Sequence, residues 1–290
     1  MSTTHTLPSP TDASRRTADG GVHLTFGRVV RSEWIKFRTL RSTIWALGAT
    51  LVVMVGIVTL FSGVIASQSQ QQQQPDQGGF SGTITVFWIA ATMAQLVVAV
   101  LGVLVITGEY STGMIRSTLS AVPQRLPALW AKGVVMAVSI FVVSSVAVGL
   151  SLISMQLFLS SKDLMPDLGD PDTQRILLGV PLYLTAIAVF SFALGAILRH
   201  SAGALATVLG LLLVVENLFQ IPWKPLQYIS PFLPGTAGIK ILQPQAEIDM
   251  MAQASTIGAD LSAWQGYGVL IIWTVVLLAV AAVLLKRRNA

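Results

Sequence analysis

The chain has 290 residues, of which 53% are hydrophobic and only 11% are charged. A soluble domain of this size carries about 25% charged residues, so the composition excludes an ordinary soluble protein and indicates an integral membrane protein. Cysteine is absent from the sequence, which excludes disulfides and thiolate metal sites.

Residues 1–23 are rich in Ser, Thr and Pro without periodicity, and we expect a disordered cytoplasmic tail. Residues 24–41 then show a helical pattern with apolar residues on one face and basic residues outside it. This pattern predicts an interfacial connecting helix that lies in the acyl boundary and turns its basic face toward anionic headgroups. The residues expected to mark it are Arg31, Trp34, Lys36, Phe37 and Arg38. Glu33 falls inside the apolar arc, so a helix packed on other parts of the protein is the alternative.

Six long hydrophobic segments follow, at about residues 43–66, 84–107, 133–159, 176–198, 201–221 and 266–285. Each holds about 20 residues or more, which is enough to cross a hydrocarbon core as a helix. The expected fold class is therefore all-α integral membrane, with residues 42–290 forming a six-span domain. Only Arg199 and His200 separate the fourth and fifth spans, so these two must form a tight antiparallel hairpin.

The basic residues are distributed unequally between the two sides of such a protein. Fourteen of the eighteen Lys and Arg residues fall on the side of the N-terminus, and four fall on the other side. The positive-inside rule then predicts that both termini lie in the cytoplasm. Because the basic charge is explained by topology, nucleic-acid binding is not expected.

Two outer connections have distinct compositions. The segment 160–175 carries Asp163, Asp167, Asp170 and Asp172; a solvated acidic loop is favoured over a weak cation site, and no metal site is expected. The segment 222–265 contains five prolines, yet residues 231–241 are largely apolar. Apolar, broken backbone beside a membrane predicts short re-entrant helices buried against protein, with an ordinary capping loop as the alternative.

No catalytic pattern is visible in the sequence. It contains no G-x-x-x-x-G-K-[ST] phosphate loop, no H-E-x-x-H and no G-x-S-x-G. We therefore expect no catalytic residues and no cofactor bound by this chain, so the energy for any transport must come from a partner.

Three polar residues in or near the spans are candidates for function. Glu216 is an ionisable residue inside the fifth span and is followed by Asn217, while Gln95 lies in the second span. An intramembrane carboxylate is expensive and is a functional candidate by default. The alternatives are a solvated interfacial Glu216 and a Gln95 that bridges helices.

Glu109 lies at the C-terminal end of the second span, where the helix dipole disfavours an anion by about 0.3–1 kcal/mol. This position predicts a cationic partner, for which Arg116, Arg38 and Arg41 are the candidates. Residues 111–122 can form a short helix with an exposed apolar surface, as a protein partner would use. The residues expected to contact that partner are Glu109, Tyr110, Met114, Ile115, Arg116 and Arg125.

Several segments together carry a family resemblance: RSEWIKFRTLRST (31–43), GEYSTGMIRSTL (108–119), AVPQRLPALWAK (121–132), LRHSAGA (198–204), WQGYGVLIIW (264–273) and LLKRRNA (284–290). The chain resembles the permease subunit of a type-2 ABC exporter, and its actinobacterial members in particular, which implies a multi-pass protein of the bacterial plasma membrane. The resemblance implies a coupling helix at about residues 111–122 and a second permease copy, which we expect to form a homodimer. It also implies two cytoplasmic ATPase subunits that hold ATP and Mg. The path would lie at the dimer interface, which makes Gln95, Glu216 and Asn217 path candidates.

The expected function is ATP-driven export of an amphipathic or hydrophobic cargo. The main alternative is a non-transporting membrane scaffold or sensor, which would need no ATPase partner. A secondary transporter would show broken spans and an inverted repeat, and no internal repeat is visible in the sequence.

Overall fold

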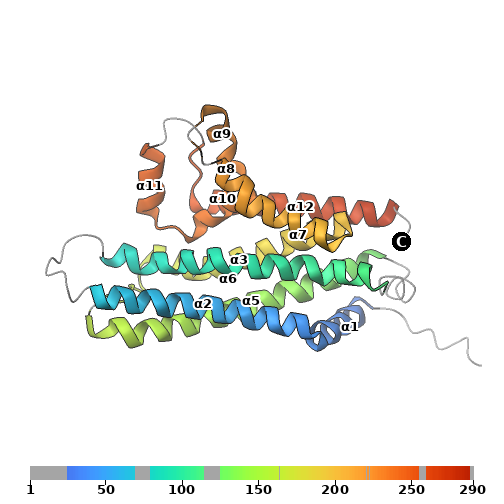
Figure 1. The fold of residues 1–290 in the computed structure, drawn as a ribbon, viewed down its shortest axis with the longest axis horizontal. Helices are drawn as coiled ribbons and strands as arrows, with labels where there is room; N and C mark the ends of the chain where they lie inside the picture. Colours follow the sequence, from blue (N-terminus) through green and yellow to red (C-terminus); the bar gives the residue numbers. More distant parts are fainter. Residues whose placement is uncertain are drawn as a thin grey trace, which may run out of the picture.

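The computed structural model describes residues 25–68, 79–113, 125–162, 164–219, 221, 223–254 and 259–287. Over these residues the chain is helical and contains no strand. The long helices are α2 (Arg41–Gln68), α3 (Gly79–Ser111), α5 (Arg125–Leu159), α6 (Pro171–Leu198) and α12 (Ala263–Arg287). They run side by side, and the shorter α1 (Phe26–Thr39) lies at one end of the bundle (Figure 1).

Six helical segments of the described chain are long and apolar enough to cross a membrane, which confirms the predicted six-span, all-α fold. The helices extend beyond the predicted spans, because α3 continues to Ser111 and α5 begins at Arg125 instead of residue 133. Pro127 falls in the first turn of α5, where its missing N–H costs no helical hydrogen bond. The connection between the second and third spans is therefore shorter than the 108–132 loop that the sequence indicated. The tail 1–23 and most of the expected coupling helix, including Met114, Ile115 and Arg116, lie outside the described residues.

The centre of the bundle is the contact between α3 and α6. Their buried side chains include Phe87, Tyr183 and Phe192, which are almost completely inaccessible to solvent. Gly102 permits the close approach, because a Cβ at this position would lie 2.3 Å from the carbonyl oxygen of Ala188. By contrast, α2 and α12 keep most of their apolar surface exposed, as lipid-facing spans do.

The predicted tight hairpin between the fourth and fifth spans is confirmed. Arg199 ends α6 in the left-handed region with φ of 57°, and its N–H donates to the carbonyl of Gly195. His200 caps the next helix, α7 (Ser201–Leu209), by accepting a hydrogen bond from the N–H of Gly203 at its Nδ1. His200 is thus a helix cap at a turn.

The fifth span contains a π-helix, η2 (Gly210–Val215), between α7 and α8 (Glu216–Leu218). The buried residues of the fifth span recur at every fourth position, at Ala204, Val208, Leu212 and Glu216. In an unbroken α-helix, twelve residues would turn Glu216 about 120° away from the face of Ala204. The wider i→i+5 turn accommodates about one extra residue, which returns Glu216 to the buried face.

The connection between the fifth and sixth spans consists of short helices. They are α9 (Lys224–Ile229), η3 (Ser230–Phe232), α10 (Pro234–Gly238), η4 (Ile239–Leu242) and α11 (Gln245–Ala254). Figure 1 shows α9 and α11 standing away from the long helices. In contrast, α10 is buried against α12, where a Cβ on Gly266 would lie 2.3 Å from the carbonyl oxygen of Ala237. Burial against protein is therefore found for α10 and η4, whereas α9 and α11 are largely exposed, and re-entry into the membrane stays a prediction.

The start of α6 clamps this connection in place. The Arg175 guanidinium donates to the carbonyl oxygens of Lys240, Ile241 and Gln243 at the end of η4. Asp172 accepts the N–H of Gln245 at 2.7 Å, at the start of α11, and pairs with Arg175 at 2.9 Å.

The described carboxylates of the acidic loop are exposed or half-buried, as expected of a solvated loop, and they also accept hydrogen bonds. Besides Asp172, Asp170 caps α6 through the N–H of Thr173 and Asp167 accepts the N–H of Gly169, while Asp163 lies outside the described residues. By accepting hydrogen bonds from backbone N–H groups, the described carboxylates hold the local structure. Among the residues that the structure describes, no cluster of His and acidic residues is able to hold a metal ion.

Candidate functional site

Helix α1 packs against α5 along one stripe of its surface. The buried residues of this stripe are Val29, Glu33 and Phe37, spaced four residues apart, so that they share one face. The expected apolar face is thus divided, because Val29 and Phe37 contact protein while Trp34 is 43% exposed. The interpretation that this whole face enters the acyl boundary is wrong, and packing on protein accounts for part of it. Glu33 lies at the centre of the buried stripe, which explains why a carboxylate interrupts the apolar pattern.

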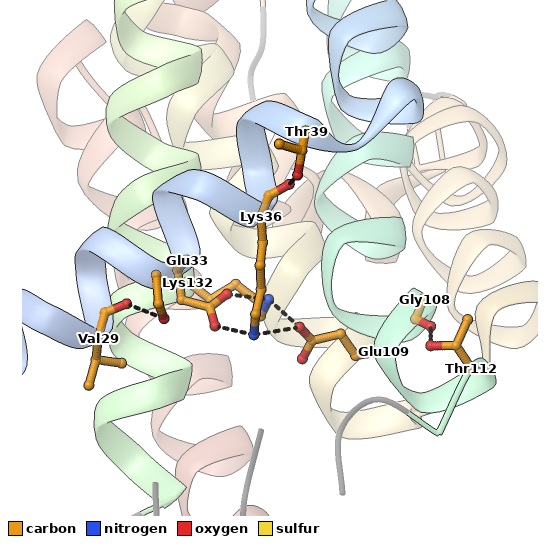
Figure 2. Close-up of polar contacts among 9 residues, drawn as sticks. Val29, Glu33, Lys36, Thr39, Gly108, Glu109, Thr112 and Lys132 are labelled. Carbon is orange, nitrogen blue, oxygen red and sulfur yellow. Dashed lines mark hydrogen bonds and ion pairs between the residues drawn. The ribbon is translucent and has the colours of Figure 1, made fainter. Parts of the chain in front are cut away.

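Four charged side chains from three helices meet beneath this stripe. Lys132 of α5 places its Nζ 2.6 Å from Oε2 of Glu33 and 2.8 Å from Oε1 of Glu109. Lys36 of α1 places its Nζ 2.8 Å from Oε1 of Glu33 and 3.7 Å from Oε1 of Glu109. Figure 2 shows both ammonium groups lying between the two carboxylates. We call these four residues the ion-pair network.

The network is balanced in charge and mostly buried. Glu33 is 3% exposed, Glu109 5% and Lys132 7%, whereas the side chain of Lys36 is 34% exposed. An ionised group at such burial is costly unless it is paired and hydrogen-bonded. The network therefore favours the relative placement of α1, α3 and α5 in which all four charges are paired.

Opposite effects of burial and pairing set the pKa values in this network. Burial alone raises the pKa of Glu33, but the attraction and hydrogen bonds of Lys132 and Lys36 outweigh it and hold the pKa below its ordinary value. Burial alone lowers the pKa of Lys36, but the hydrogen bond and attraction of Glu33, followed by those of Glu109, raise it above its ordinary value. Both groups are thus held in their charged forms at neutral pH.

The prediction that Glu109 has a cationic partner is confirmed, but the partners are different from those expected. They are Lys132 and Lys36. Arg38 of α1 and Arg41, the first residue of α2, are exposed and absent from the network, and Arg116 lies outside the described residues. Oε2 of Glu109 is buried and has no hydrogen-bond partner among the described residues.

Of the other residues expected to contact a partner, Tyr110 lies in the last turn of α3. The guanidinium of Arg199 lies 5.3 Å from the centre of the Tyr110 ring, a cation–π contact that joins the ends of α3 and α6. Arg125 is the first residue of α5, and Arg31 on α1 is exposed.

Sequence reasoning missed two members of the network, Glu33 and Lys132. The signal for Glu33 was a carboxylate inside an apolar arc, and the signal for Lys132 was a lone cation directly before an apolar span. Each is a charge placed where only apolar residues are expected, which indicates a buried partner.

A cavity of about 670 Å³ lies toward the short helices and brings the three path candidates together. Gln95, Glu216 and Asn217 all line it, together with Tyr183 of α6 and Lys240 of η4. The hydroxyl of Tyr183 donates to Oε1 of Gln95. The sequence did not show that these residues share a cavity, because they lie far apart in the chain. Their role in a cargo path stays a prediction.

Glu216 sits at the N-terminus of α10. Its Oε1 accepts the N–H of Gly235 at 2.6 Å, and Oγ1 of Thr236 lies 3.5 Å from its Oε2. The residue before α10, Leu233, supplies no side-chain cap, so Glu216 satisfies this helix end from a different span. A Cβ at Gly235 would lie 2.2 Å from Oε2 of Glu216, so a larger residue here would displace the Glu216 carboxylate. Glu216 is 7% exposed, so the alternative of a carboxylate solvated at the interface is wrong.

The fold and these two sites define a multi-pass membrane protein in which charged residues fasten an amphipathic helix to the spans and a polar cavity lies among helices. The family model described as ABC-2 family transporter protein matches residues 28–290, and the chain belongs to this family. The protein is therefore a permease of an ABC transporter, a membrane subunit without its own ATPase that associates with an ABC ATPase subunit. A search of curated proteins found no significant match.

Proposed function

We propose that this permease exports an amphipathic or hydrophobic cargo from the cytoplasm as a homodimer with two ATPase subunits. Both termini would lie in the cytoplasm, and ATP and Mg would be held by the partner subunits. The cargo path would run along the second and fifth spans at the dimer interface. The observation that supports this proposal best is the ion-pair network.

The network lies where an ATPase signal would enter the spans. Glu109 lies at the end of α3 and Lys132 in the first turns of α5, so the two flank the segment expected to form the coupling helix. A displacement of that segment would act on α3 and α5, and the buried pairs would oblige α1 to move with them. Breaking a pair would leave a buried charge uncompensated, so the three helices would shift as one unit.

The test uses the complete transporter, which is the permease with Glu109→Gln together with its partner ATPase. We expect ATP hydrolysis to persist while transport falls about tenfold, measured as ATP-dependent accumulation of the neutral dye Nile red in inside-out vesicles. The matched control is Arg38→Gln, which removes an exposed cation of α1 outside the network. Wild-type transport in the Glu109 variant would contradict the coupling role.

Separate measurements test the direction of transport and the class of protein. ATP-dependent accumulation in inside-out vesicles supports export, and accumulation only in right-side-out vesicles contradicts it. A chain that purifies without any ATPase supports the scaffold alternative. Because the sequence contains no cysteine, single cysteines at Ser160 and Arg287 can report topology through a membrane-impermeant maleimide. We expect labelling from outside at residue 160 alone.

A further inference from the structure

The C-terminal end of α3 contacts two different sets of helices through two consecutive residues. Glu109 pairs with Lys132 of α5 and Lys36 of α1 in the ion-pair network. The ring of Tyr110 instead lies against Arg199, whose guanidinium carbon is 5.3 Å from the ring centre. Figure 1 shows α1 and α12 on opposite sides of α3. Adjacent residues at one helix end therefore lead to different sides of the bundle.

The guanidinium of Arg199 also contacts the last span. Its Nη2 lies 3.5 Å from the carbonyl oxygen of Leu284, in the last turn of α12. The last four carbonyls of a helix have no partner within the helix and carry the negative end of its dipole, so a cation is favoured there. Arg199 itself ends α6 and lies two residues before the start of α7. One side chain thus joins the ends of α3, α6 and α12 at the turn that begins α7.

The backbone of Arg199 shows that local preference does not explain an arginine at this turn. With φ of 57°, it is the only non-glycine residue with a positive φ in the described chain. Glycine adopts this conformation at helix ends without steric cost. Its Nε is also buried without a hydrogen-bond partner among the described residues. Such strain persists where surrounding contacts impose it, and it is common in parts of proteins that move.

The two spans that meet at Arg199 are the least buried of the six. In the described structure, 22% of the apolar stretch is buried in both the fifth and the sixth span, against 61% in the second and 72% in the fourth. The fourth span packs closely on α3 and can follow it through that packing alone. The fifth and sixth spans have less packing to hold them, so a specific polar contact has a larger share in their placement.

We propose that Arg199 is a positioning residue that makes the fifth and sixth spans follow displacements of α3. It does so through the Tyr110 ring on one side and the Leu284 carbonyl on the other. The ion-pair network would serve α1 and α5 in the same way, so the end of α3 would distribute one movement to both sides of the bundle. This inference rests on the proposed function, because an ATPase must displace α3.

The test uses the purified complex of permease and ATPase in lipid nanodiscs. Because the sequence contains no cysteine, a single cysteine can carry a bimane fluorophore at Val276 of α12 or at Leu60 of α2. Both positions are exposed, by 50% and 65%. Since α2 packs against α3 and α5, its label reports movement that bypasses Arg199. The measurement is the change in bimane emission when Mg-ATP and orthovanadate are added.

We expect Arg199→Gln and Tyr110→Leu each to reduce the α12 response about fivefold, the value of one cation–π contact, and to leave the α2 response unchanged. Glutamine tolerates the positive φ no better than arginine, so the backbone strain stays the same. The matched controls are Tyr110→Phe, which keeps the ring, and Arg199→Lys, which keeps the cation; both should retain most of the α12 response. The double variant Tyr110→Leu/Arg199→Gln should be no weaker than either single variant.

Several results would overturn the role of Arg199 while leaving the proposed function intact. They are an undiminished α12 response in Arg199→Gln and Tyr110→Leu, an equal loss at both labels, which indicates a purely structural role, or a wild type whose α2 label alone responds. Silence of both labels in the wild-type complex would contradict the ATPase-driven mechanism and this inference with it. Responses as expected without ATP-dependent accumulation of Nile red would count against the export function alone.

Discussion

Replacing Lys132 by Met tests the ion-pair network most directly. Lys132 is the only member that lies within 3 Å of both carboxylates, at 2.6 Å from Glu33 and 2.8 Å from Glu109. After the substitution, Glu33 keeps Lys36 at 2.8 Å, but Glu109 keeps only Lys36 at 3.7 Å. A carboxylate that is 5% exposed would then have no close cation in the described structure.

The expected cost follows from that burial. Removing one partner of a buried ion pair destabilises a protein by about 3–5 kcal/mol, and the lower end applies here because Lys36 compensates in part. Lys36→Met is the matched control, because it removes the same chemical group at a position that is 34% exposed. Solvent screens that position, so its cost should be about 1 kcal/mol or less.

The measurement is reversible unfolding of the purified permease in mixed micelles, followed by the loss of helical circular dichroism. Lys132→Met should cost about 3 kcal/mol, and adding Glu109→Gln should restore about half of that by removing the unpaired carboxylate. A Lys132 variant as stable as Lys36→Met, or a double variant no more stable than Lys132→Met alone, would refute the reasoning.

Three further predictions concern pH and close packing. The pKa of Glu33 lies below its ordinary 4.5, so its contribution to the free energy of unfolding is complete above that value and is lost as pH falls through the lower, folded-state pKa. Acid titration of wild type and Glu33→Gln should show the two stabilities converging only in that acidic range. Gly102→Ala should destabilise the protein by about 1–3 kcal/mol in the same unfolding assay, because the new Cβ would lie 2.3 Å from a backbone oxygen. The control is Gly108→Ala on the same helix, whose Cβ would meet no atom within 4 Å. This control should be neutral or slightly stabilising. Gly235→Ala should lower the melting temperature, because the Cβ of the new alanine would lie 2.2 Å from Glu216 Oε2. Combining it with Glu216→Ala should cost less stability than the sum of the two single changes, since the second change removes the clash. Strict additivity of the two changes would contradict the contact.

Much of the fold could be predicted from the sequence. The six spans follow from the length and apolar composition of each segment, because a hydrocarbon core imposes that requirement on every helix separately. The hairpin at Arg199 and His200 follows in the same way, since two residues allow no other connection. The requirement of Glu109 for a cation was also local, because the end of its own helix creates the unfavourable field.

The tertiary structure alone decided which groups meet. Lys132 is 99 residues from Glu33 in the chain, and their pairing depends on the relative rotation and depth of two helices. Large apolar side chains can face either lipid or protein, because lipid tails are as apolar as these side chains, so periodicity was unable to show that Val29 and Phe37 pack against protein. The convergence of Gln95, Glu216 and Asn217 on one cavity likewise required the π-helical turn and the placement of α10, which depend on contacts between distant segments.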